Sequence, residues 1–118
     1  MEQALSTLVS EKNEMVKKGQ IVEATDRFFA PMAQTLDFDG TSTSNKDQML
    51  EKMKQFAGSI GSVNGIEQHH SSLSGNVSFS EFTFDFVMKD GSHILWHEII
   101  RSVWENGLIV EEQYFKTY

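Results

Sequence analysis

The fold is decided by residues 77–118, which read VSFSEFTFDFVMKDGSHILWHEIIRSVWENGLIVEEQYFKTY. Apolar and polar side chains alternate through most of this stretch, which is the period of a β-strand with one buried face. Two interruptions, KDG at 89–91 and ENG at 105–107, contain residues that form hairpin turns between antiparallel strands. The stretch therefore predicts three successive strands, Val77–Met88, Ser92–Glu105 and Leu108–Tyr118.

The alternation continues upstream to Ile66, which adds a fourth strand over residues 66–74 before a Ser-Gly-Asn turn. Before Gly65, apolar residues instead recur every three or four positions, as they do on one face of a helix. This period predicts three helices over residues 5–16, 21–29 and 45–57, which end at Gly19, at Pro31 and at Gly58 with Gly61.

The residues between the second and third helices predict a short strand and a helix cap. Residues 35–39 alternate briefly like a strand, and Gly40 marks the turn after them. Ser44 and Asp47 have the spacing of a capping box, so we expect Ser44 to cap the third helix. In the first helix, the apolar stripe contains Leu5, Leu8, Val9, Lys12, Met15 and Val16.

Helices that precede a hairpin-linked sheet indicate an α+β fold, with the helices packed on one face of an antiparallel sheet. The chain has 118 residues, which is the usual size of one domain. We therefore expect residues 1–118 to form a single domain.

Composition and charge exclude several classes of function. Seventeen acidic against ten basic residues give a net charge of -7, which disfavours a nucleic-acid-binding surface. The chain has no cysteine, so disulfides, thiolate catalysis and cysteine-ligated metals are excluded. No apolar stretch reaches the roughly 18 residues of a membrane span. Residues 1–10 lack the basic start of a signal peptide, so we expect a cytoplasmic protein.

The turn lengths determine which side chains share a face of the sheet, because a change of one residue in register exchanges the faces. Three-residue loops at 89–91 and 105–107 would pair Phe84 with Trp96, Ile100 with Glu112 and Glu98 with Tyr114. One face would then contain Phe82, Phe84, Phe86, Ile94, Trp96, Ile100, Trp104 and Val110, interrupted by Glu98, Glu112 and the Tyr114 hydroxyl. Two-residue loops would pair an aromatic stripe with a polar one, so we prefer three-residue loops.

The order of these elements resembles the nuclear transport factor 2-like superfamily, and within it the SnoaL-like branch, over nearly the whole chain. The residues that carry the resemblance are the Phe28-Phe29-Ala30 segment and the Trp-x-Asn-Gly-x-Ile turn at 104–109 before a Glu-x-aromatic strand. The resemblance implies a cone-like, cystatin-like fold in which a curved antiparallel sheet wraps three helices around a pocket. It also implies a homodimer joined through the outer face of the sheet.

The superfamily includes ketosteroid isomerases, polyketide cyclases, epoxide hydrolases, dehydratases and non-catalytic binding proteins, and these reactions need no cofactor. By resemblance, the general base of a ketosteroid isomerase corresponds to Asp37 or Asp39 and its neutral acid to Glu98, about one inward position away. The tyrosine that such isomerases carry in the first helix has no counterpart in this sequence. We favour Asp37 as the inward acid, because Asp39-Gly40 is ordinary turn chemistry.

Carboxylates on an apolar face are candidates for acid–base chemistry. Glu98 and Glu112 on neighbouring strands would push their pKa values apart by repulsion, as a general acid and base require. The alternative is a structural role at the cavity mouth, with hydrogen bonds to Tyr114 and the backbone. Our candidate catalytic residues are therefore Glu98, Glu112 and Asp37.

His69 and His70 are adjacent on a strand, so one points inward, and we take His69 as the candidate for the pocket. A two-residue turn after Ser74 would place His69 beside Phe82 on the inner face, and His69 or His70 would be the histidine of a SnoaL-type His/Asp arrangement. His93 and His97 are about 13 Å apart along one strand, too far to share a metal ion, so we expect no metal site. The candidate ligand-binding residues are Tyr114, Trp96, His69, Phe82, Phe84 and Trp104.

Three functions remain open from the sequence. The first is a protein that binds a small apolar, possibly cyclic, ligand in an enclosed pocket. The second is a cofactor-independent isomerase, cyclase or hydrolase that uses the pocket carboxylates. The third is a non-catalytic dimerisation module. The expected partners are a small apolar ligand and a second copy of the chain, with no nucleic acid and no membrane.

Overall fold

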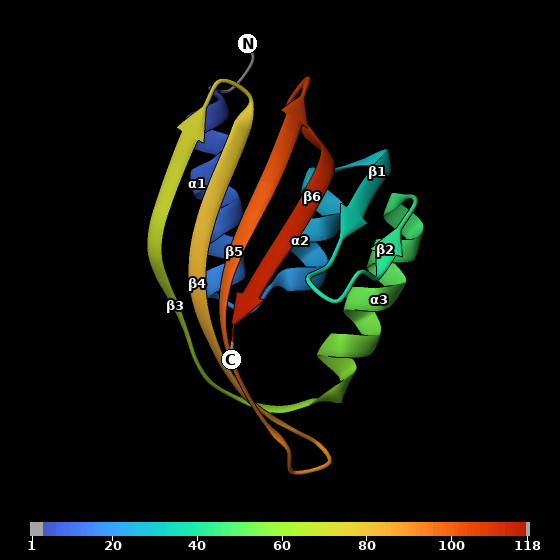
Figure 1. Cartoon of the computed structure of the whole chain (residues 1–118), viewed down its shortest axis with the longest axis vertical. Helices are drawn as coiled ribbons and strands as arrows, with labels where there is room; N and C mark the ends of the chain where they lie inside the picture. Colours follow the sequence, from blue (N-terminus) through green and yellow to red (C-terminus); the bar gives the residue numbers. More distant parts are fainter. Residues whose placement is uncertain (1–3, 118) are drawn as a thin grey trace.

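Three helices lie on one face of a single six-stranded sheet in the computed structural model, which describes residues 4–117 (Figure 1). The sheet order is β2-β1-β6-β5-β4-β3. The helices are α1 (Leu5–Lys17), α2 (Ile21–Phe28) and α3 (Lys46–Ser59), and the strands are β1 (Phe29–Leu36), β2 (Ser42–Thr43), β3 (Ile60–Ser74), β4 (Val77–Met88), β5 (His93–Glu105) and β6 (Leu108–Thr117). Within residues 4–117, no helix is long and apolar enough to cross a membrane.

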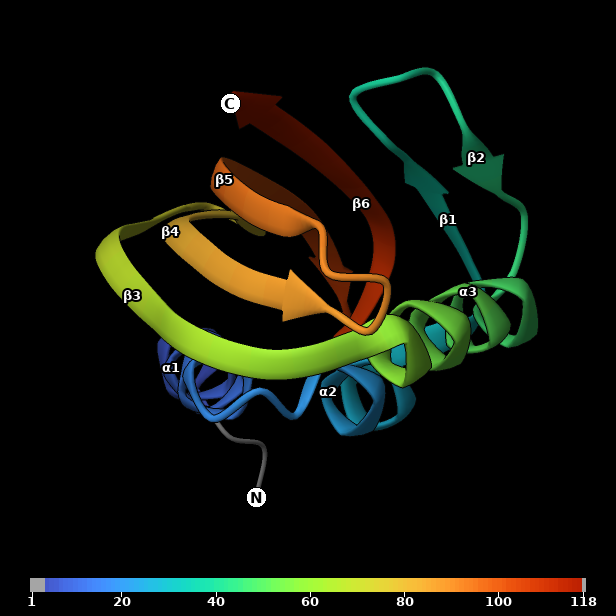
Figure 2. The same cartoon turned by 90° about the horizontal axis from the view of Figure 1, so that it is seen from below.

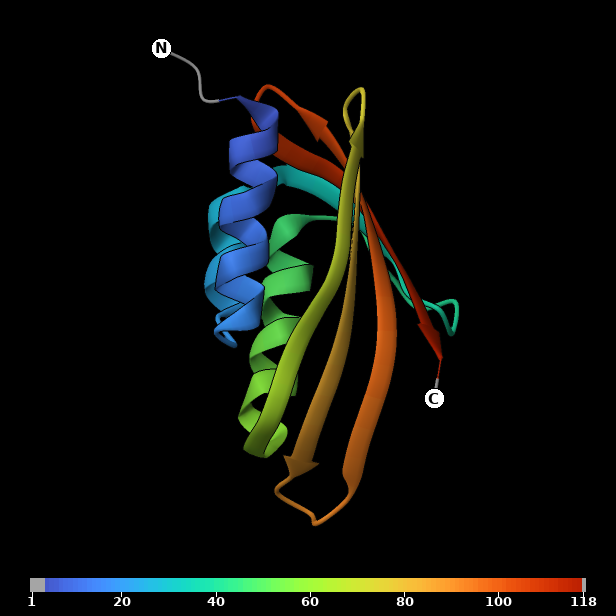
Figure 3. The ribbon, with the colours of Figure 1, turned by 90° about the vertical axis from the view of Figure 1, so that its left-hand side faces the viewer.

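The predicted antiparallel meander is confirmed in strands β3 to β6. Seen from below, these strands curve, and α1 and α2 lie beneath β3 (Figure 2). Seen from the side, all three helices lie on the same side of the long strands (Figure 3). The space between the helices and the concave face of the sheet is therefore where the core and any cavity must lie. Tyr118, which we included in the last strand, lies outside the described residues.

The prediction of an all-antiparallel sheet is wrong, because β1 pairs with β6 in parallel. β1 starts at Phe29, directly after α2, and is longer than the short strand expected at residues 35–39. Pro31 lies inside it, at a position where a missing N–H is tolerated because the ladder to β6 is irregular between Phe29 and Gln34. Asp37 follows the end of β1 as a result, and it begins the loop to β2.

β3 starts at Ile60, six residues before the predicted start at Ile66. We interpreted Gly61 as part of a helix end, but it pairs against β4 at close range. A Cβ atom at Gly61 would lie 3.1 Å from the Val87 carbonyl oxygen, which is closer than ordinary packing allows. The close approach of the two backbones therefore favours glycine there.

The predicted register between β4 and β5 is confirmed. Phe84 pairs with Trp96, Phe82 with Glu98, and the loop 89–91 has three residues with Gly91 at φ +88°. The Met88 amide donates to the Ser92 carbonyl oxygen at 2.8 Å and closes the hairpin. The aromatic side chains that we expected on the inner face of β4 therefore do face the helices.

The predicted register between β5 and β6 is wrong by two residues. Asn106 and Gly107, at φ +53° and +79°, form a two-residue turn, so Glu105 pairs with Leu108. A bulge at Val110 then adds one more residue, and Ile100 pairs with Tyr114. Since the total shift is an even number, Tyr114 and Glu112 still face the helices. Ile109 is fully buried in the place expected for Val110.

The third helix is capped one residue later than predicted. The Asn45 side chain accepts from the Gln48 amide at 2.9 Å, and the Gln48 side-chain oxygen accepts from the Ser44 amide at 2.8 Å. This pattern is close to a capping box, except that Gln48 accepts from the residue before the N-cap. It uses Asn45 and Gln48 in place of Ser44 and Asp47, because asparagine is as good an N-cap as serine.

Candidate functional site

A cavity of about 180 Å³ lies between the three helices and the inner faces of β4, β5 and β6. Most of its wall is apolar, and two polar clusters interrupt it. The apolar lining residues are Val16, Ile21, Ala24, Met49, Met53, Phe56, Phe84, Phe86, Trp96 and Ile100. The polar lining residues are Lys12, Thr25, Asp37, Lys52, Glu98, Glu112, Tyr114 and Lys116.

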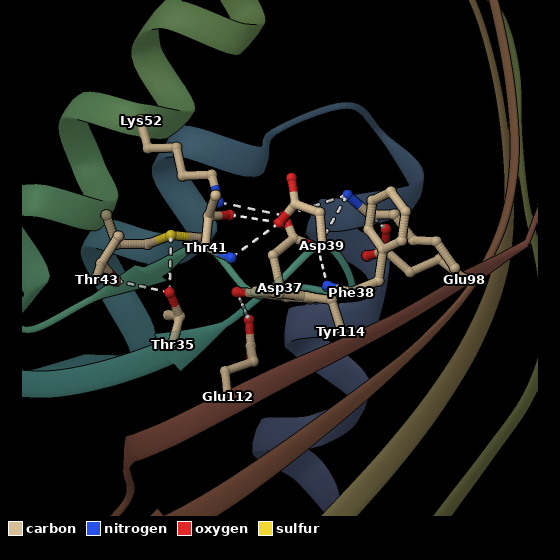
Figure 4. Close-up of polar contacts among 12 residues, drawn as sticks. Thr35, Asp37, Phe38, Asp39, Thr41, Thr43, Lys52, Glu98, Glu112 and Tyr114 are labelled. Atoms are coloured by element: carbon tan, nitrogen blue, oxygen red, sulfur yellow. Dashed lines mark hydrogen bonds and ion pairs between the residues drawn. The ribbon is translucent and has the colours of Figure 1, made fainter.

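The first polar cluster surrounds the buried carboxylate of Glu112 on β6. One of its oxygens accepts from the Tyr114 hydroxyl at 2.6 Å (Figure 4). The other accepts from the Ser102 hydroxyl at 2.6 Å. The Lys12 ammonium of α1 lies 3.2 Å from the second oxygen. Three donors thus satisfy Glu112, which fits a carboxylate that positions other groups.

Tyr114 has its hydroxyl proton committed to Glu112. Burial, together with the Glu112 carboxylate beside it, raises the pKa of Tyr114 well above its usual value. Tyr114 therefore stays neutral, and its oxygen can still accept a hydrogen bond from a group in the cavity.

The second polar cluster lies around Asp37, at the start of the β1–β2 loop. The Asp37 amide donates to the Thr41 carbonyl oxygen at 2.8 Å, and this bond holds the loop closed. The Asp37 carboxylate lies 3.2 Å from the Lys52 ammonium of α3 (Figure 4). It also lies 3.4 Å from the Lys116 ammonium of β6. Asp37 thus joins three parts of the chain at the cavity.

Glu98 belongs to the same cluster but has a weaker partner. Its nearest cation is Lys116, with 3.6 Å between the ammonium and the carboxylate oxygen. Only 7% of Glu98 is exposed. Burial raises the pKa of Glu98 to about 7, and the Lys116 charge offsets only part of that rise. Near neutral pH, Glu98 is therefore poised between its acid and carboxylate forms.

Aromatic rings form one wall of the cavity. Trp96 stacks on Phe56 of α3, with ring centres 5.5 Å apart and planes inclined by 15°. The Lys116 ammonium lies 4.1 Å from the Trp96 ring centre, within the range of a cation–π interaction. Trp96 therefore connects the apolar wall to the charged cluster.

Six of our nine candidate site residues line this cavity, namely Asp37, Phe84, Trp96, Glu98, Glu112 and Tyr114. Asp37 lies inside as we favoured, whereas the Asp39 carboxylate is exposed and accepts from Thr41. Phe82 and Trp104 are fully buried in the core beside it, where the Trp104 ring N–H donates to Ser78 at 2.9 Å. These two rings stabilise the fold without lining the cavity.

The inward placement of His69 is wrong. The turn after Ser74 does have two residues, but β3 bulges between Gln68 and His70, so Gln68 pairs with Phe82. His69 therefore lies on the convex face, where its ring bonds the Thr83 hydroxyl at 2.7 Å. A bulge exchanges the faces of a strand and leaves no signal in a pattern of alternating residues.

The three lysines of the lining were not among the site residues predicted from the sequence. Lys12 lies within the apolar stripe of α1, and a lysine at such a position is a sign of a buried ion pair. The structure has this ion pair, between Lys12 and Glu112. Lys52 and Lys116 gave no comparable signal, because both are ordinary residues of amphipathic elements. Among residues 4–117, no group of three or more histidines and acids is placed to hold a metal ion.

Comparison with solved structures identifies the fold. A candidate SnoaL-like polyketide cyclase from Mesorhizobium loti has a TM-score of 0.84 at 19% identity, with 96% of this chain and 99% of that one covered. A protein of unknown function from Burkholderia pseudomallei, described as nuclear transport factor 2-like, has a TM-score of 0.81 at 14% identity, covering 98% and 92%.

A second candidate SnoaL-like polyketide cyclase, from Jannaschia sp. CCS1, has a TM-score of 0.77 at 8% identity, covering 98% of this chain and 90% of that one. No protein-family model and no curated protein matches the sequence. The chain therefore has the nuclear transport factor 2-like, SnoaL-like fold that the sequence resemblance implied.

Proposed function

We propose that this chain is a SnoaL-like domain that binds a small, apolar, ring-containing molecule in its cavity. The observation that carries the proposal is the composition of the cavity wall. Aromatic and aliphatic side chains surround the space, and a few charged and hydroxyl groups are held in place by hydrogen bonds and ion pairs. This mixture is typical of small-molecule sites, where apolar contacts give affinity and polar groups fix orientation.

The volume limits the size of the ligand. A cavity of roughly 150 Å³ can hold benzene, and drug-sized ligands occupy pockets of about 300 Å³ or more. The cavity of about 180 Å³ therefore suits a molecule with one ring and a short substituent. A four-ring steroid would need the helices to move apart, which weighs against a steroid substrate.

The test is binding of neutral one-ring compounds, such as benzyl alcohol and benzamide, measured by thermal shift and by calorimetry. Binding to the folded state raises its melting temperature by mass action. Ala24→Leu fills space at the cavity wall and should abolish the shift, whereas Ala57→Leu on α3, outside the lining, should leave it unchanged. Equal responses of both variants would place binding elsewhere.

A second candidate function is a cofactor-independent isomerase, cyclase or hydrolase. Glu98 favours it, because a general acid or base works best with a pKa near the operating pH. In this role Glu98 transfers the proton. Lys116 lowers and Asp37 raises the pKa of Glu98, and Glu112 positions Tyr114. Two neighbours in structure carry the description polyketide cyclase, which suits ring chemistry of this kind.

The enzyme hypothesis is tested with ligands found in the binding screen that have an acidic C–H bond. Incubation in deuterium oxide should lead to exchange at that carbon in the presence of the protein. Glu98→Gln should lose the exchange and keep the binding, and Lys54→Gln on the exposed side of α3 should keep both. Binding without exchange in the unaltered protein would contradict the enzyme and leave the binding function.

We also propose a homodimer through the convex face of the sheet. Leu95 is 52% exposed and Phe115 is 46% exposed on this face, and Phe79 on β4 is 39% exposed. Apolar side chains exposed together on one surface are typical of interfaces. Light scattering should give twice the mass of one chain, and Leu95→Glu should halve it; a monomer before substitution would contradict the dimer.

A further inference from the structure

The lysines and acids around the cavity are paired at unequal distances, and the longest of these pairs indicates the chemical class of the ligand. Among the described residues, the lining contains three lysines and three acids. Lys12 is matched by Glu112 at 3.2 Å, and Lys52 is matched by Asp37 at 3.2 Å. The remaining pair is Lys116 with Glu98, and it has the longest separation of the three, 3.6 Å.

Lys116 is held close to the cavity without a short hydrogen bond to either acid. Its ammonium lies 3.4 Å from Asp37 and 3.6 Å from Glu98, whereas a strong bond between an ammonium and a carboxylate is about 2.7–2.9 Å long. The side chain is only 10% exposed, and the Trp96 ring lies 4.1 Å from the charge. Lys116 can therefore form a shorter bond with an acceptor that enters the cavity.

Glu98 complements Lys116 when it carries its proton. A protonated carboxyl donates one hydrogen bond, and it removes the negative charge that Lys116 would otherwise face. Burial favours this form of Glu98 up to about pH 7. The charged and titratable groups around it are Lys12 on α1, Asp37 before β2, Lys52 on α3, and Glu112, Tyr114 and Lys116 on β6. With Glu98 neutral, these groups sum to one positive charge.

We propose that the ligand is a one-ring monocarboxylic acid, whose carboxylate binds between the Lys116 ammonium and the Glu98 carboxyl while its ring packs against Trp96 and the apolar wall. This inference rests on the proposed binding function and names its ligand class. A cationic ligand would be repelled by Lys116, and a neutral one would leave Lys116 with only its longer contacts to Asp37 and Glu98. A carboxylate satisfies Lys116 and accepts from Glu98 at the same time.

The experiment compares one-ring compounds of similar size whose polar group is a carboxylate, an amide or an ammonium. Benzoate, phenylacetate and cyclohexanecarboxylate are set against their amides and against benzylamine, with calorimetry at pH 6 and thermal shift as a second readout. We expect each acid to bind at least about tenfold more tightly than its amide, since a hydrogen bond to a charged group contributes roughly 1.5–3 kcal/mol. Benzylamine should bind more weakly than the amides.

Variants of Lys116 assign the effect to this site. Lys116→Gln should lower the affinity for the acids about tenfold and leave that for the amides unchanged. Lys116→Arg keeps the charge and should keep the preference for acids. Lys54→Gln removes the same charge from the exposed side of α3 and should change nothing, which controls for the overall charge of the protein.

The outcomes separate this inference from the proposed function. Amides that bind as well as the acids, or acids that keep their affinity in Lys116→Gln, would overturn the inference and leave a pocket for neutral rings. Tighter binding of benzylamine would overturn it in favour of a cationic ligand. Failure of every acid, amide and amine to bind would overturn the proposed function, and the inference with it.

Discussion

Lys12 on α1 and Glu112 on β6 form a buried ion pair, 3.2 Å between ammonium and carboxylate, with side chains 8% and 5% exposed. The pair connects the first helix to the last strand across the cavity. Removal of charges from water costs several kcal/mol unless each charge has a good partner. The position of α1 on the sheet therefore depends on both charges being present.

Loss of one member of this pair should destabilise the fold strongly. Lys12→Met leaves Glu112 buried without its cation, and we expect the free energy of unfolding to fall by about 3 kcal/mol. Glu112→Gln should have a similar effect by leaving Lys12 unmatched. The double variant should lose much less than the sum of the two, as measured by urea unfolding. Strict additivity would mean that the two charges do not interact.

Glu98 should make stability depend on pH in a defined direction. Its pKa is about 7 in the folded state and near 4.5 when the chain is unfolded, so the folded state holds the proton more tightly. The contribution of Glu98 to stability is greatest below about pH 4.5, and it is lost as the pH rises through 7. The loss approaches the order of 3 kcal/mol, at about 1.4 kcal/mol for each unit of pKa difference.

The glutamine variant isolates this contribution. Glu98→Gln cannot ionise, so its stability relative to the unaltered protein should improve as the pH rises from 5 to about 7 and level off towards pH 8 in urea unfolding. Glu105→Gln, at the exposed end of β5, should follow the unaltered protein across the same range. A constant difference between Glu98→Gln and the unaltered protein would show that Glu98 has an ordinary pKa.

The early start of β3 can be tested at its two glycines. Gly61→Ala would place a Cβ atom 3.1 Å from the Val87 carbonyl oxygen, and we expect a loss of about 1–3 kcal/mol. Gly65→Ala meets no atom within 4 Å and should be neutral or slightly stabilising. If thermal unfolding gave both variants the same stability, the close pairing of Gly61 with β4 would be wrong.

The cap of α3 should depend on Asn45. Asn45→Ala removes the acceptor for the Gln48 amide and should cost about 1 kcal/mol. Ser44→Ala should cost little, because Ser44 contributes its backbone amide to the cap and that amide is retained. Chemical denaturation of the two variants distinguishes them, and a larger loss for Ser44→Ala would restore the cap expected from the sequence alone.

The two tryptophans should report differently on ligand binding. Trp96 lines the cavity, whereas Trp104 is fully buried beside it and donates to Ser78. A bound one-ring compound should change the emission of Trp96. Trp96→Phe should therefore lose the fluorescence response to benzoate or benzamide, and Trp104→Phe should keep it despite lower stability. A response that followed Trp104 would place the ligand in the core.

Local patterns were enough to predict the elements that carry the cavity. Turn residues and a period of two located β4, β5 and β6 within one residue of their described bounds, because a strand with one buried face repeats its side-chain chemistry every second residue. The same period placed Glu98, Glu112 and Tyr114 on the inner face, and it did so even with the wrong register after the second turn. An even register error leaves the faces unchanged.

The sequence by itself determined the α+β class, the four-stranded meander and the inward carboxylates, because each depends on neighbours in the chain. The tertiary structure alone decided the parallel pairing of β1 with β6, the bulge that turns His69 outward, and the lysines that match Asp37 and Glu112. These depend on contacts between segments far apart in the chain, and a bulge needs only one extra residue. The spacing of apolar residues along the chain indicates neither the long-range contacts nor the bulge. The charges that surround the cavity therefore could be identified only from the tertiary structure.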